Sequence, residues 1–259
     1  MLVGAHARDI VFEHYLGVAS QRLTTDIDIG LSVDNWEMFE KFKSSLVDQG
    51  FEENSKSQQR LSYGVSSNST SEDLIQLDVV PHGGINDSNK DISWPPDGSM
   101  KMSVLGFQEA YDSALTIRID ENLDIRVISV TGLALLKLIA WIDRPSNLRQ
   151  KDALDLKFSL LNYEALPNIQ DQIFDQGFAE RYEFEMHKAA AAKFGSDVKS
   201  ISSPACNNFI NEKLFADSQE TTFEKFVFDM SPRMNNDDDS QQHNYEMLLA
   251  FRDGFLKTT

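Results

Sequence analysis

The sequence predicts an α/β amino-terminal domain, residues 1–128, followed by an all-helical carboxy-terminal domain, residues 129–259. In the first domain, short segments in which apolar and polar residues alternate, as in strands, are interspersed with segments of helical spacing. After Ser129, every periodic segment has apolar residues three or four positions apart, which is the spacing of a helix. A chain of 259 residues, of which 41% are hydrophobic, is long enough for two modest domains.

The first domain is expected to begin with a helix and a strand. A helix is predicted over 6–16 (HARDIVFEHYL), because its apolar residues have helical spacing and a glycine follows. The alternating segment 26–33 predicts a strand, and Asp34 or Asn35 then caps a second helix that ends at Gly50. The apolar stripe of this helix is interpreted as core rather than as a base-stacking surface, and consists of Trp36, Phe39, Phe42 and Leu46. Further strands are predicted at 60–65, 74–80, 115–119 and 123–128.

Glycines, prolines and acidic runs mark the irregular segments. Residues 81–103 contain Gly83-Gly84 and Pro95-Pro96 and are predicted to be a loop. In the second domain, the polar segment 235–242 is predicted to be a solvated linker. Helices are predicted there over 131–144, 151–163, 168–194, 204–216, 221–229 and 241–256.

The charge balance is strongly acidic, with 41 Asp and Glu against 24 Lys and Arg and a formal net charge of −17. Such a surface repels phosphate backbones at long range, which disfavours an extended nucleic acid as partner while leaving room for local basic patches. The single cysteine, Cys206, excludes an intrachain disulfide. No segment has the pattern of a signal peptide or of a membrane span, so we expect a soluble cytoplasmic protein.

Two aspartates lie within a predicted strand, in the segment TTDIDIGLSV (24–33). Side chains two positions apart in a strand point to the same face, so Asp26 and Asp28 are expected side by side. Neighbouring like charges destabilise a sheet, so keeping both requires a compensating partner. An exposed acidic face is the ordinary explanation of such a pair, whereas the strand context and a third acid favour a functional one.

The third acid is Asp78, in the otherwise apolar segment LIQLDVV (74–80). A lone charge in such a strand is costly to bury. Three carboxylates from neighbouring strands could share Mg²⁺, or Mn²⁺ in its place, because both ions prefer oxygen ligands. The cation would remove the repulsion between the acids, and two such ions can bridge the attacking and leaving oxygens of a phosphoryl transfer.

Gly4 is expected where a first strand turns into a helix. Glycine permits close approach of the backbone, and the start of a helix offers unpaired N–H groups and partial positive charge to a phosphate. Alone, the pair Gly4-Ala5 indicates little, and it gains weight only from the acids that follow it.

The order of Gly4-Ala5, a helix, Asp26-Ile27-Asp28 and Asp78 resembles that of nucleotidyltransferases with the polymerase-beta-like fold. More narrowly, several segments look like the bacterial nucleotidyltransferases grouped with the AbiEii toxins of type IV toxin–antitoxin systems: LVGAHARD, RLTTDIDIGLSV, WPP, VLGFQEAY and ALLKLIAW-DR-KDALDL. The resemblance covers residues 2–161, with a looser match at 194–204 (FGSDVKSISSP). It implies an α/β nucleotidyltransferase core with a mixed sheet. It also implies in-line transfer of a nucleoside monophosphate from a nucleoside triphosphate to a hydroxyl acceptor, with release of pyrophosphate.

The resemblance also implies roles for individual residues. Asp26 and Asp28 would bind metal, and Asp78 would be either a third metal ligand or the base that deprotonates the acceptor. Gly4 and the Ala5 amide would meet the triphosphate. Position 5 carries Ala where the polymerase-beta-like superfamily commonly carries Ser, so no side-chain hydroxyl is available there.

Basic residues near the predicted helices are further candidates for nucleotide binding. Lys137 and Arg144 lie seven positions apart on one helical face and could face the triphosphate; alternatively, the head of Lys137 reaches water. The resemblance gives Lys151 and Asp152 a supporting role in a KD-x-x-D segment, a pattern that equally suits an ordinary charged helix start. Arg8 is a further candidate for holding phosphate.

Two functions are therefore open. The first is a Mg²⁺-dependent nucleotidyltransferase of a toxin–antitoxin system, with an antitoxin protein as partner. Its acceptor would be a protein, a small molecule or RNA, and the acidity of the chain favours the first two. The alternative, motivated by Ala5, is a catalytically silent member that binds nucleotide or a partner protein.

Overall fold

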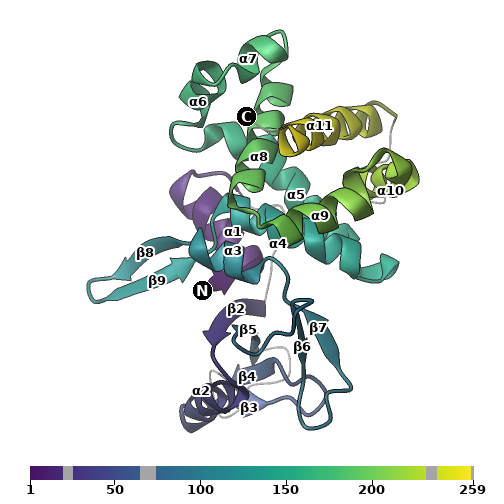
Figure 1. Ribbon diagram of the computed structural model, residues 1–259. Helices are drawn as coiled ribbons and strands as arrows, with labels where there is room; N and C mark the ends of the chain where they lie inside the picture. The colour runs from purple at the N-terminus through teal and green to yellow at the C-terminus, as the bar shows by residue number, and fades with distance from the viewer. Residues whose placement is uncertain (20–25, 65–73, 232–237, 258–259) are drawn as a thin grey trace. The chain divides into compact units, whose positions relative to one another are not determined.

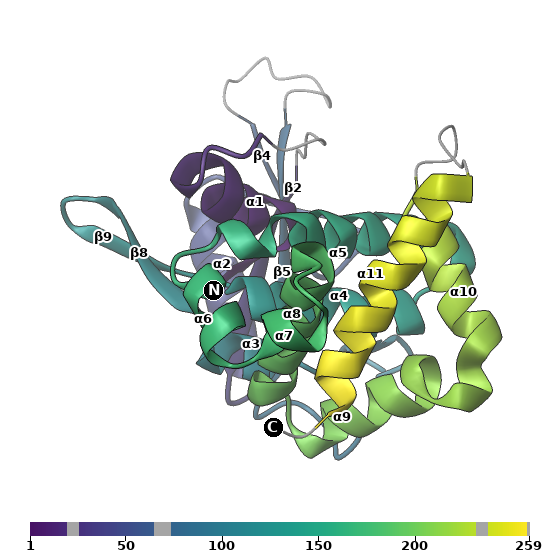
Figure 2. The ribbon, with the colours of Figure 1, turned by 90° about the horizontal axis from the view of Figure 1, so that it is seen from above.

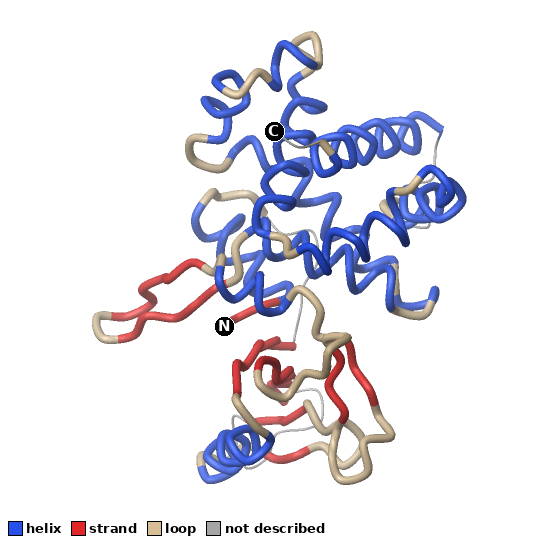
Figure 3. The backbone as a smooth tube through the Cα atoms, viewed as in Figure 1, coloured by secondary structure: helices blue, strands red, loops and turns tan. Residues whose placement is uncertain are grey.

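A computed structural model describes residues 1–19, 26–64, 74–231 and 238–257 of the chain (Figure 1). It divides into two compact units, Met1–Ser129 and Val130–Thr259. The first unit combines strands and helices, whereas the described part of the second contains helices and loops (Figure 3). An α/β core followed by a helical region is therefore confirmed as the fold class.

A seven-stranded mixed sheet organises the first unit. Its strands, given in spatial order, are β3 (Glu52–Glu53), β4 (Arg60–Gly64), β5 (Leu74–Gly83), β2 (Asp26–Val33), β1 (Leu2–Val3), β9 (Leu123–Val127) and β8 (Leu115–Asp120). Strands β2 and β5 are parallel, as are β1 and β9, and the other neighbours are antiparallel. Strand β2 has the bounds that the alternation of its residues predicts.

The helices of the first unit follow from local signals in the sequence. They are α1 (Gly4–Asp9), which continues as the π-helix η1 (Ile10–Tyr15), α2 (Trp36–Asp48) and α3 (Phe107–Asp112). The Asn35 side chain caps α2, because its oxygen accepts a hydrogen bond of 3.0 Å from the Met38 amide. Helix α3 lies in a segment to which the sequence analysis assigns no element.

A hydrophobic core cluster of the first unit lies around β2, β4 and β5. Phe39 of α2 packs edge-on against Trp94, with 5.7 Å between ring centroids, and Trp36 contacts both rings. This aromatic group is core, as predicted from its helical spacing. The buried members of the cluster are Val33, Phe39, Leu61, Leu77, Val79, Ile92, Trp94 and Val104.

The prediction of a loop over 81–103 is wrong. Strand β5 continues to Gly83, and the strands β6 (Asp91–Ser93) and β7 (Lys101–Ser103) pair as a separate antiparallel hairpin. The many polar residues of this segment hide its structure, because the buried Ile92 and Trp94 stand among polar residues and prolines.

The second unit consists of α-helices joined by short 3₁₀- and π-helical turns. Its α-helices are α4 (Val130–Asp143), α5 (Gln150–Asn162), α6 (Ile169–Asp175), α7 (Phe178–Arg181), α8 (Met186–Ile201), α9 (Pro204–Ile210), α10 (Glu220–Asp229) and α11 (Asp238–Leu256). Helix α11 packs along α8 so closely that a β-carbon on Gly254 would lie 1.8 Å from the Ala192 carbonyl oxygen (Figure 2). No described helix has the length and hydropathy needed to span a bilayer.

Two predictions for the second unit are corrected by the structure. The stretch 168–194 is not one helix, because residues with a left-handed backbone conformation interrupt it. Gly177 lies between α6 and α7, and Glu183 and Phe184 lie between α7 and α8. The segment 235–242 is not wholly a linker, because α11 begins at Asp238. Acidic residues in its first turn stabilise the positive end of the helix dipole. Residues 235–237 lie outside the described part of the chain.

Candidate functional site

The structure brings three carboxylates together on one face of the sheet. Asp26 and Asp28 lie two positions apart in β2, so their side chains share a face. Asp28 is in register with Asp78 of the parallel strand β5, and Asp26 is in register with Gln76. Residues in register on adjacent strands point to the same side of the sheet. We call Asp26, Asp28 and Asp78 the acid row.

An arginine that the sequence analysis did not single out lies in the acid row. Arg60 of β4 is in antiparallel register with Asp78. Its guanidinium donates two hydrogen bonds to that carboxylate, Nε to Oδ1 at 2.7 Å and Nη2 to Oδ2 at 2.6 Å. The same Nη2 lies 3.5 Å from Asp26 Oδ2.

Electrostatics link Arg60 to all three acids. The hydrogen bond to Asp78 is the largest influence that raises the pKa of Arg60 above its usual range, and the charges of Asp78, Asp26 and Asp28 add to it. Arg60 therefore supplies positive charge to the acid row, the role that the sequence analysis gave to a divalent cation. Its importance depends on strand pairing, which no local pattern in the sequence reveals.

The donor set of the acid row fits a divalent cation in part. Within the described residues, no three His, Cys, Asp or Glu side chains are grouped so as to hold a metal ion. Arg60 engages both oxygens of Asp78. The Asp26 side chain is 41% exposed, whereas that of Asp78 is 17% exposed. Asp26 shares its face of the strand with Asp28. Two carboxylates, completed by water and phosphate oxygens, match the ligands that Mg²⁺ takes in proteins.

Gly4 lies against Asp28. It has a left-handed backbone with φ of +70°, and a β-carbon built on it would lie 2.1 Å from Asp28 Oδ2. Glycine is required at position 4 both by its conformation and by this close approach. We had predicted that a phosphate approaches the glycine, whereas the group seated there in the structure is the carboxylate of the acid row.

The other predicted phosphate ligands near the amino terminus are largely enclosed. Ala5 is buried in α1. Arg8 is also buried, and its Nε and Nη2 donate hydrogen bonds to Asp9 Oδ1 at 2.9 and 2.7 Å. Arg8 is thus held by a carboxylate of its own helix.

The predicted site residues of the second unit form a cluster of their own. Lys137 of α4 lies 3.1 Å from Asp152 Oδ1 and 2.7 Å from Asp155 Oδ2, both on α5. Arg144 donates a hydrogen bond of 2.6 Å to Asp152 Oδ2. We call Lys137, Arg144, Asp152 and Asp155 the ion-pair cluster. The ammonium of Lys137 is therefore paired with two buried carboxylates instead of extending into water.

Members of the ion-pair cluster differ in access to solvent. Asp152 and Asp155 are buried, and the Lys137 side chain is largely so, whereas the Arg144 side chain is 39% exposed. Lys151, the neighbour of Asp152 in the chain, is exposed on α5. Asp152 thus holds Lys137 and Arg144 in place from a position without contact with water.

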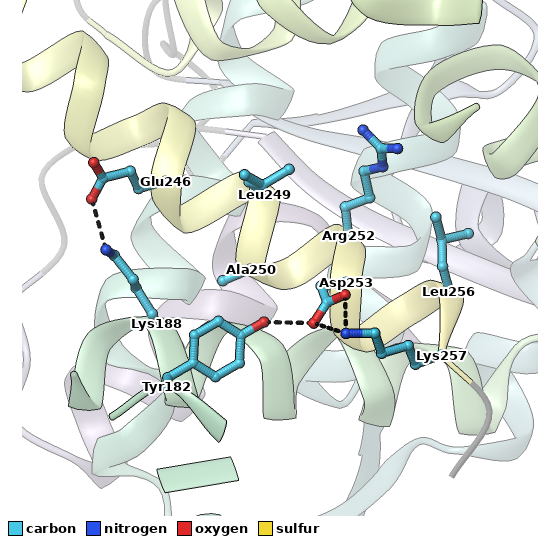
Figure 4. A pocket seen from close by; sticks show the side chains of 9 residues that line it. All are labelled: Tyr182, Lys188, Glu246, Leu249, Ala250, Arg252, Asp253, Leu256 and Lys257. Atoms are coloured by element: carbon cyan, nitrogen blue, oxygen red, sulfur yellow. Dashed lines mark hydrogen bonds and ion pairs between the residues drawn. The ribbon is translucent and has the colours of Figure 1, made fainter. Parts of the chain in front are cut away.

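An open pocket of about 550 Å³ in the second unit lies along α11 (Figure 4). Four of its charged side chains form two ion pairs, Lys188 with Glu246 at 3.1 Å and Lys257 with Asp253 at 2.6 Å. The fifth, Arg252, pairs with Asp217 outside the lining. Tyr182 donates a hydrogen bond of 2.8 Å to Asp253. Burial raises the pKa of the Tyr182 hydroxyl, and this hydrogen bond adds to the effect. The charged side chains of the pocket are thus already paired, and no residue of the acid row or the ion-pair cluster lines it.

Comparison with known proteins yields one family. The family described as "Nucleotidyl transferase AbiEii toxin, Type IV TA system" matches residues 15–235. This range includes the acid row and the ion-pair cluster, and it leaves out Gly4, Ala5 and Arg8. No curated protein matches the chain.

Proposed function

We propose, from the premise that this chain belongs to the AbiEii family of nucleotidyl transferase toxins of type IV toxin–antitoxin systems, that it is an active Mg²⁺-dependent enzyme. The reaction is the transfer of a nucleoside monophosphate from a nucleoside triphosphate to a hydroxyl group. An antitoxin protein is the partner that this family implies. The net charge of −17 favours a protein or a small molecule as acceptor over RNA.

The acid row is the observation that carries this proposal. Asp26 and Asp28 alternate along β2, and the register with β5 adds Asp78 on the same face. Carboxylates so close together are unfavourable unless cations neutralise them. In our proposal Asp26 and Asp28 would hold Mg²⁺ or Mn²⁺, and the ion would supply neutralising charge to the triphosphate.

The acceptor hydroxyl supplies the attacking atom. Its oxygen forms a bond to the α-phosphorus, while the bond from that phosphorus to the bridging oxygen of pyrophosphate breaks. We assign Asp78 as the group that accepts the hydroxyl proton, since it shares its face with both metal-binding acids. Catalysis comes chiefly from positioning and charge neutralisation.

The triphosphate requires further cationic partners. We assign Lys137 and Arg144 to this role, with Lys151 as an exposed neighbour and Asp152 as the group that orients the first two. Of the two paired cations, Arg144 is better placed than Lys137 to reach a ligand, because its side chain is 39% exposed against 14% for Lys137. Gly4 and the amide of Ala5 remain proposed phosphate contacts at the start of α1, with Arg8 beside them.

A catalytically silent protein that binds nucleotide is the second candidate. Two observations favour it: Arg60 engages both oxygens of Asp78, and the buried residue at position 5 is Ala, without a hydroxyl. Such a protein would bind a nucleoside triphosphate with Mg²⁺ and transfer nothing.

The two candidates differ in a transfer assay. The full chain is incubated with each of the four α-labelled nucleoside triphosphates, Mg²⁺ and a cell lysate, and label is followed into protein, RNA and small molecules. We expect transfer by the wild type and loss of transfer in Asp26→Asn and Asp28→Asn. Asp124→Asn is the matched control, because Asp124 is also a strand carboxylate bound by an arginine, in the hairpin of β8 and β9.

Each outcome of the assay assigns one candidate. Full transfer by Asp26→Asn or Asp28→Asn would contradict the role of the acid row. Calorimetric binding of a nucleoside triphosphate by the wild type, with no label transferred to any fraction, would favour the silent protein.

A further inference from the structure

We propose that Arg60 is a positioning residue that holds Asp78 while no metal ion is bound, and that releases it when a divalent cation enters the acid row. This inference rests on the proposed function, because it concerns the same carboxylates. It adds a residue that neither the sequence analysis nor the resemblance to the family assigns.

The geometry places Arg60 where it competes with a cation. Its guanidinium binds Asp78 through two parallel N–H···O bonds, at 2.7 and 2.6 Å, and reaches within 3.5 Å of Asp26. A bidentate arginine occupies both oxygens of a carboxylate in a fixed plane. With Arg60 in place, Asp78 cannot offer the same oxygens to a metal ion or accept a proton from a hydroxyl.

A second arginine pair in the same unit shows what is particular to Arg60. Arg118 of β8 is in register with Asp124 of β9 and binds it in the same bidentate way, at 2.7 and 3.0 Å. The Arg118 side chain is 68% exposed, against 33% for Arg60. Arg60 differs because it is more enclosed and because Asp26 and Asp28 also act on its charge.

The charges of the acid row give the direction of the effect. With Arg60 present, its guanidinium contributes positive charge to all three carboxylates; without it, that contribution is lost. Removal of Arg60 therefore makes the row more attractive to a divalent cation and less stable without one. An arginine in this place keeps the acids together before the metal ion binds, at the expense of metal affinity.

The exchange has a consequence for the order of events. Asp78 becomes available as a base only after Arg60 has moved, and a cation that binds Asp26 and Asp28 favours that movement by repelling the guanidinium. The base would then act only in the metal-loaded protein.

Binding of Mn²⁺, followed by electron paramagnetic resonance, tests the inference without an activity assay. Mn²⁺ is titrated into wild type, Arg60→Gln, Arg60→Lys and the control Arg118→Gln. We expect Arg60→Gln to bind Mn²⁺ roughly fivefold more tightly than the wild type. This factor corresponds to the interaction energy of a partly exposed ion pair, which the cation no longer has to displace. Arg60→Lys keeps the positive charge but lacks the planar guanidinium, so its Mn²⁺ affinity should lie between those of wild type and Arg60→Gln. The Mn²⁺ affinity of Arg118→Gln should equal that of the wild type.

Further variants connect the effect to Asp78. In the Asp78→Asn background, Arg60→Gln should gain much less affinity, because the carboxylate that it would release is gone. In chelator, the melting temperature of Arg60→Gln should be lower than that of the wild type. Addition of Mg²⁺ should raise the melting temperature of Arg60→Gln by more than it raises that of the wild type. If Arg60→Gln does not fold in chelator, restoration of folding by Mg²⁺ supports the inference. The Mn²⁺ affinity of Arg60→Lys then decides it, because this variant should bind Mn²⁺ more tightly than the wild type.

The results separate this inference from the function on which it rests. Equal Mn²⁺ affinity of wild type, Arg60→Gln and Arg60→Lys overturns the role of Arg60, while loss of binding in Asp26→Asn would still uphold the metal site. Absence of Mn²⁺ binding from all these variants, Arg60→Gln included, overturns both.

Discussion

The carboxylate of Asp28 lies against the backbone of Gly4, so close that a β-carbon at position 4 would come within 2.1 Å of its Oδ2. Gly4 follows the short strand β1 and is the first residue of α1, and the last residue of β1, Val3, is in register with Asp28 of β2. The glycine that opens the first helix therefore fixes the position of one member of the acid row. A change at this glycine should affect the acid row before it affects the rest of the sheet.

Gly4→Ala should destabilise the protein and displace Asp28. The left-handed backbone alone costs a non-glycine residue about 1–2 kcal/mol, and the clash with Asp28 should add about 1–3 kcal/mol. Urea denaturation measures the free energy of unfolding, and a Mn²⁺ titration reports on the carboxylate.

Gly17→Ala is a matched control for this prediction. Gly17 also has a φ of +70°, but nothing lies within 4 Å of the place that its β-carbon would take. It should show the cost of the conformation alone, with normal Mn²⁺ binding. Equal losses of stability in the two variants would show that the contact with Asp28 is not restrictive.

Asp152 should be the most sensitive member of the ion-pair cluster. It is fully buried and accepts hydrogen bonds from both Lys137 and Arg144. Asp152→Ala should lower the free energy of unfolding by about 3 kcal/mol, because it removes one of the two buried carboxylates that hold the largely buried Lys137 ammonium. It should also weaken nucleoside triphosphate binding, since both cations lose their orientation; calorimetry measures this second effect.

The exposed pair of Glu37 and Lys41 provides the comparison for Asp152. Its atoms are 2.7 Å apart, yet both side chains are more than two-thirds exposed. Glu37→Ala should change stability by about 0.5 kcal/mol or less. A loss of similar size in Asp152→Ala would contradict the importance given to burial in the cluster.

A buried histidine in β5 predicts how stability depends on pH. His82 is 1% exposed and packs between Phe107 and Tyr111, and in the described structure neither ring nitrogen has a hydrogen-bond partner. Burial lowers the pKa of His82 from 6.5 to about 4. Because the unfolded chain binds this proton more readily, the free energy of unfolding should fall as the pH falls from 6.5 to 4, by roughly 3 kcal/mol.

Replacement of the ring should remove this dependence. His82→Leu is close in volume and cannot be protonated, so its stability should decline less between pH 6.5 and 4 than that of the wild type. His187→Leu, at an exposed histidine, should retain the wild-type decline. Urea denaturation at several pH values provides the comparison, and parallel curves for wild type and His82→Leu would refute the assignment.

Local patterns in the sequence are sufficient to predict the elements that carry the candidate acids. The alternation around Asp26 and Asp28 gives β2 with its observed bounds, and the apolar context of Asp78 indicates a strand. Both predictions depend on the alternation of side chains between the core face and the opposite face of a strand. This alternation can be recognised from a few consecutive residues.

Features that depend on contacts between distant segments are not visible in this way. Arg60 looks like an ordinary first residue of a strand, and it matters only because β4 pairs with β5 in a register that places it beside Asp78. The hairpin of β6 and β7 is likewise hidden among polar residues, although Ile92 and Trp94 are buried in the core and Met102 packs against it. Asp152 could be found in the sequence, but its burial beneath Lys137 and Arg144 could not.

The central claim is that the carboxylates of β2 bind the cation that accompanies the nucleotide. Its most direct test is a crystal of the full chain grown with Mn²⁺ and a non-hydrolysable nucleoside triphosphate, with anomalous diffraction recorded for manganese. The account predicts an anomalous peak bonded to Asp26 and Asp28 and to oxygens of the triphosphate. Nucleotide and manganese bound elsewhere on the chain, with Asp26 and Asp28 still paired only with protein groups, would contradict it.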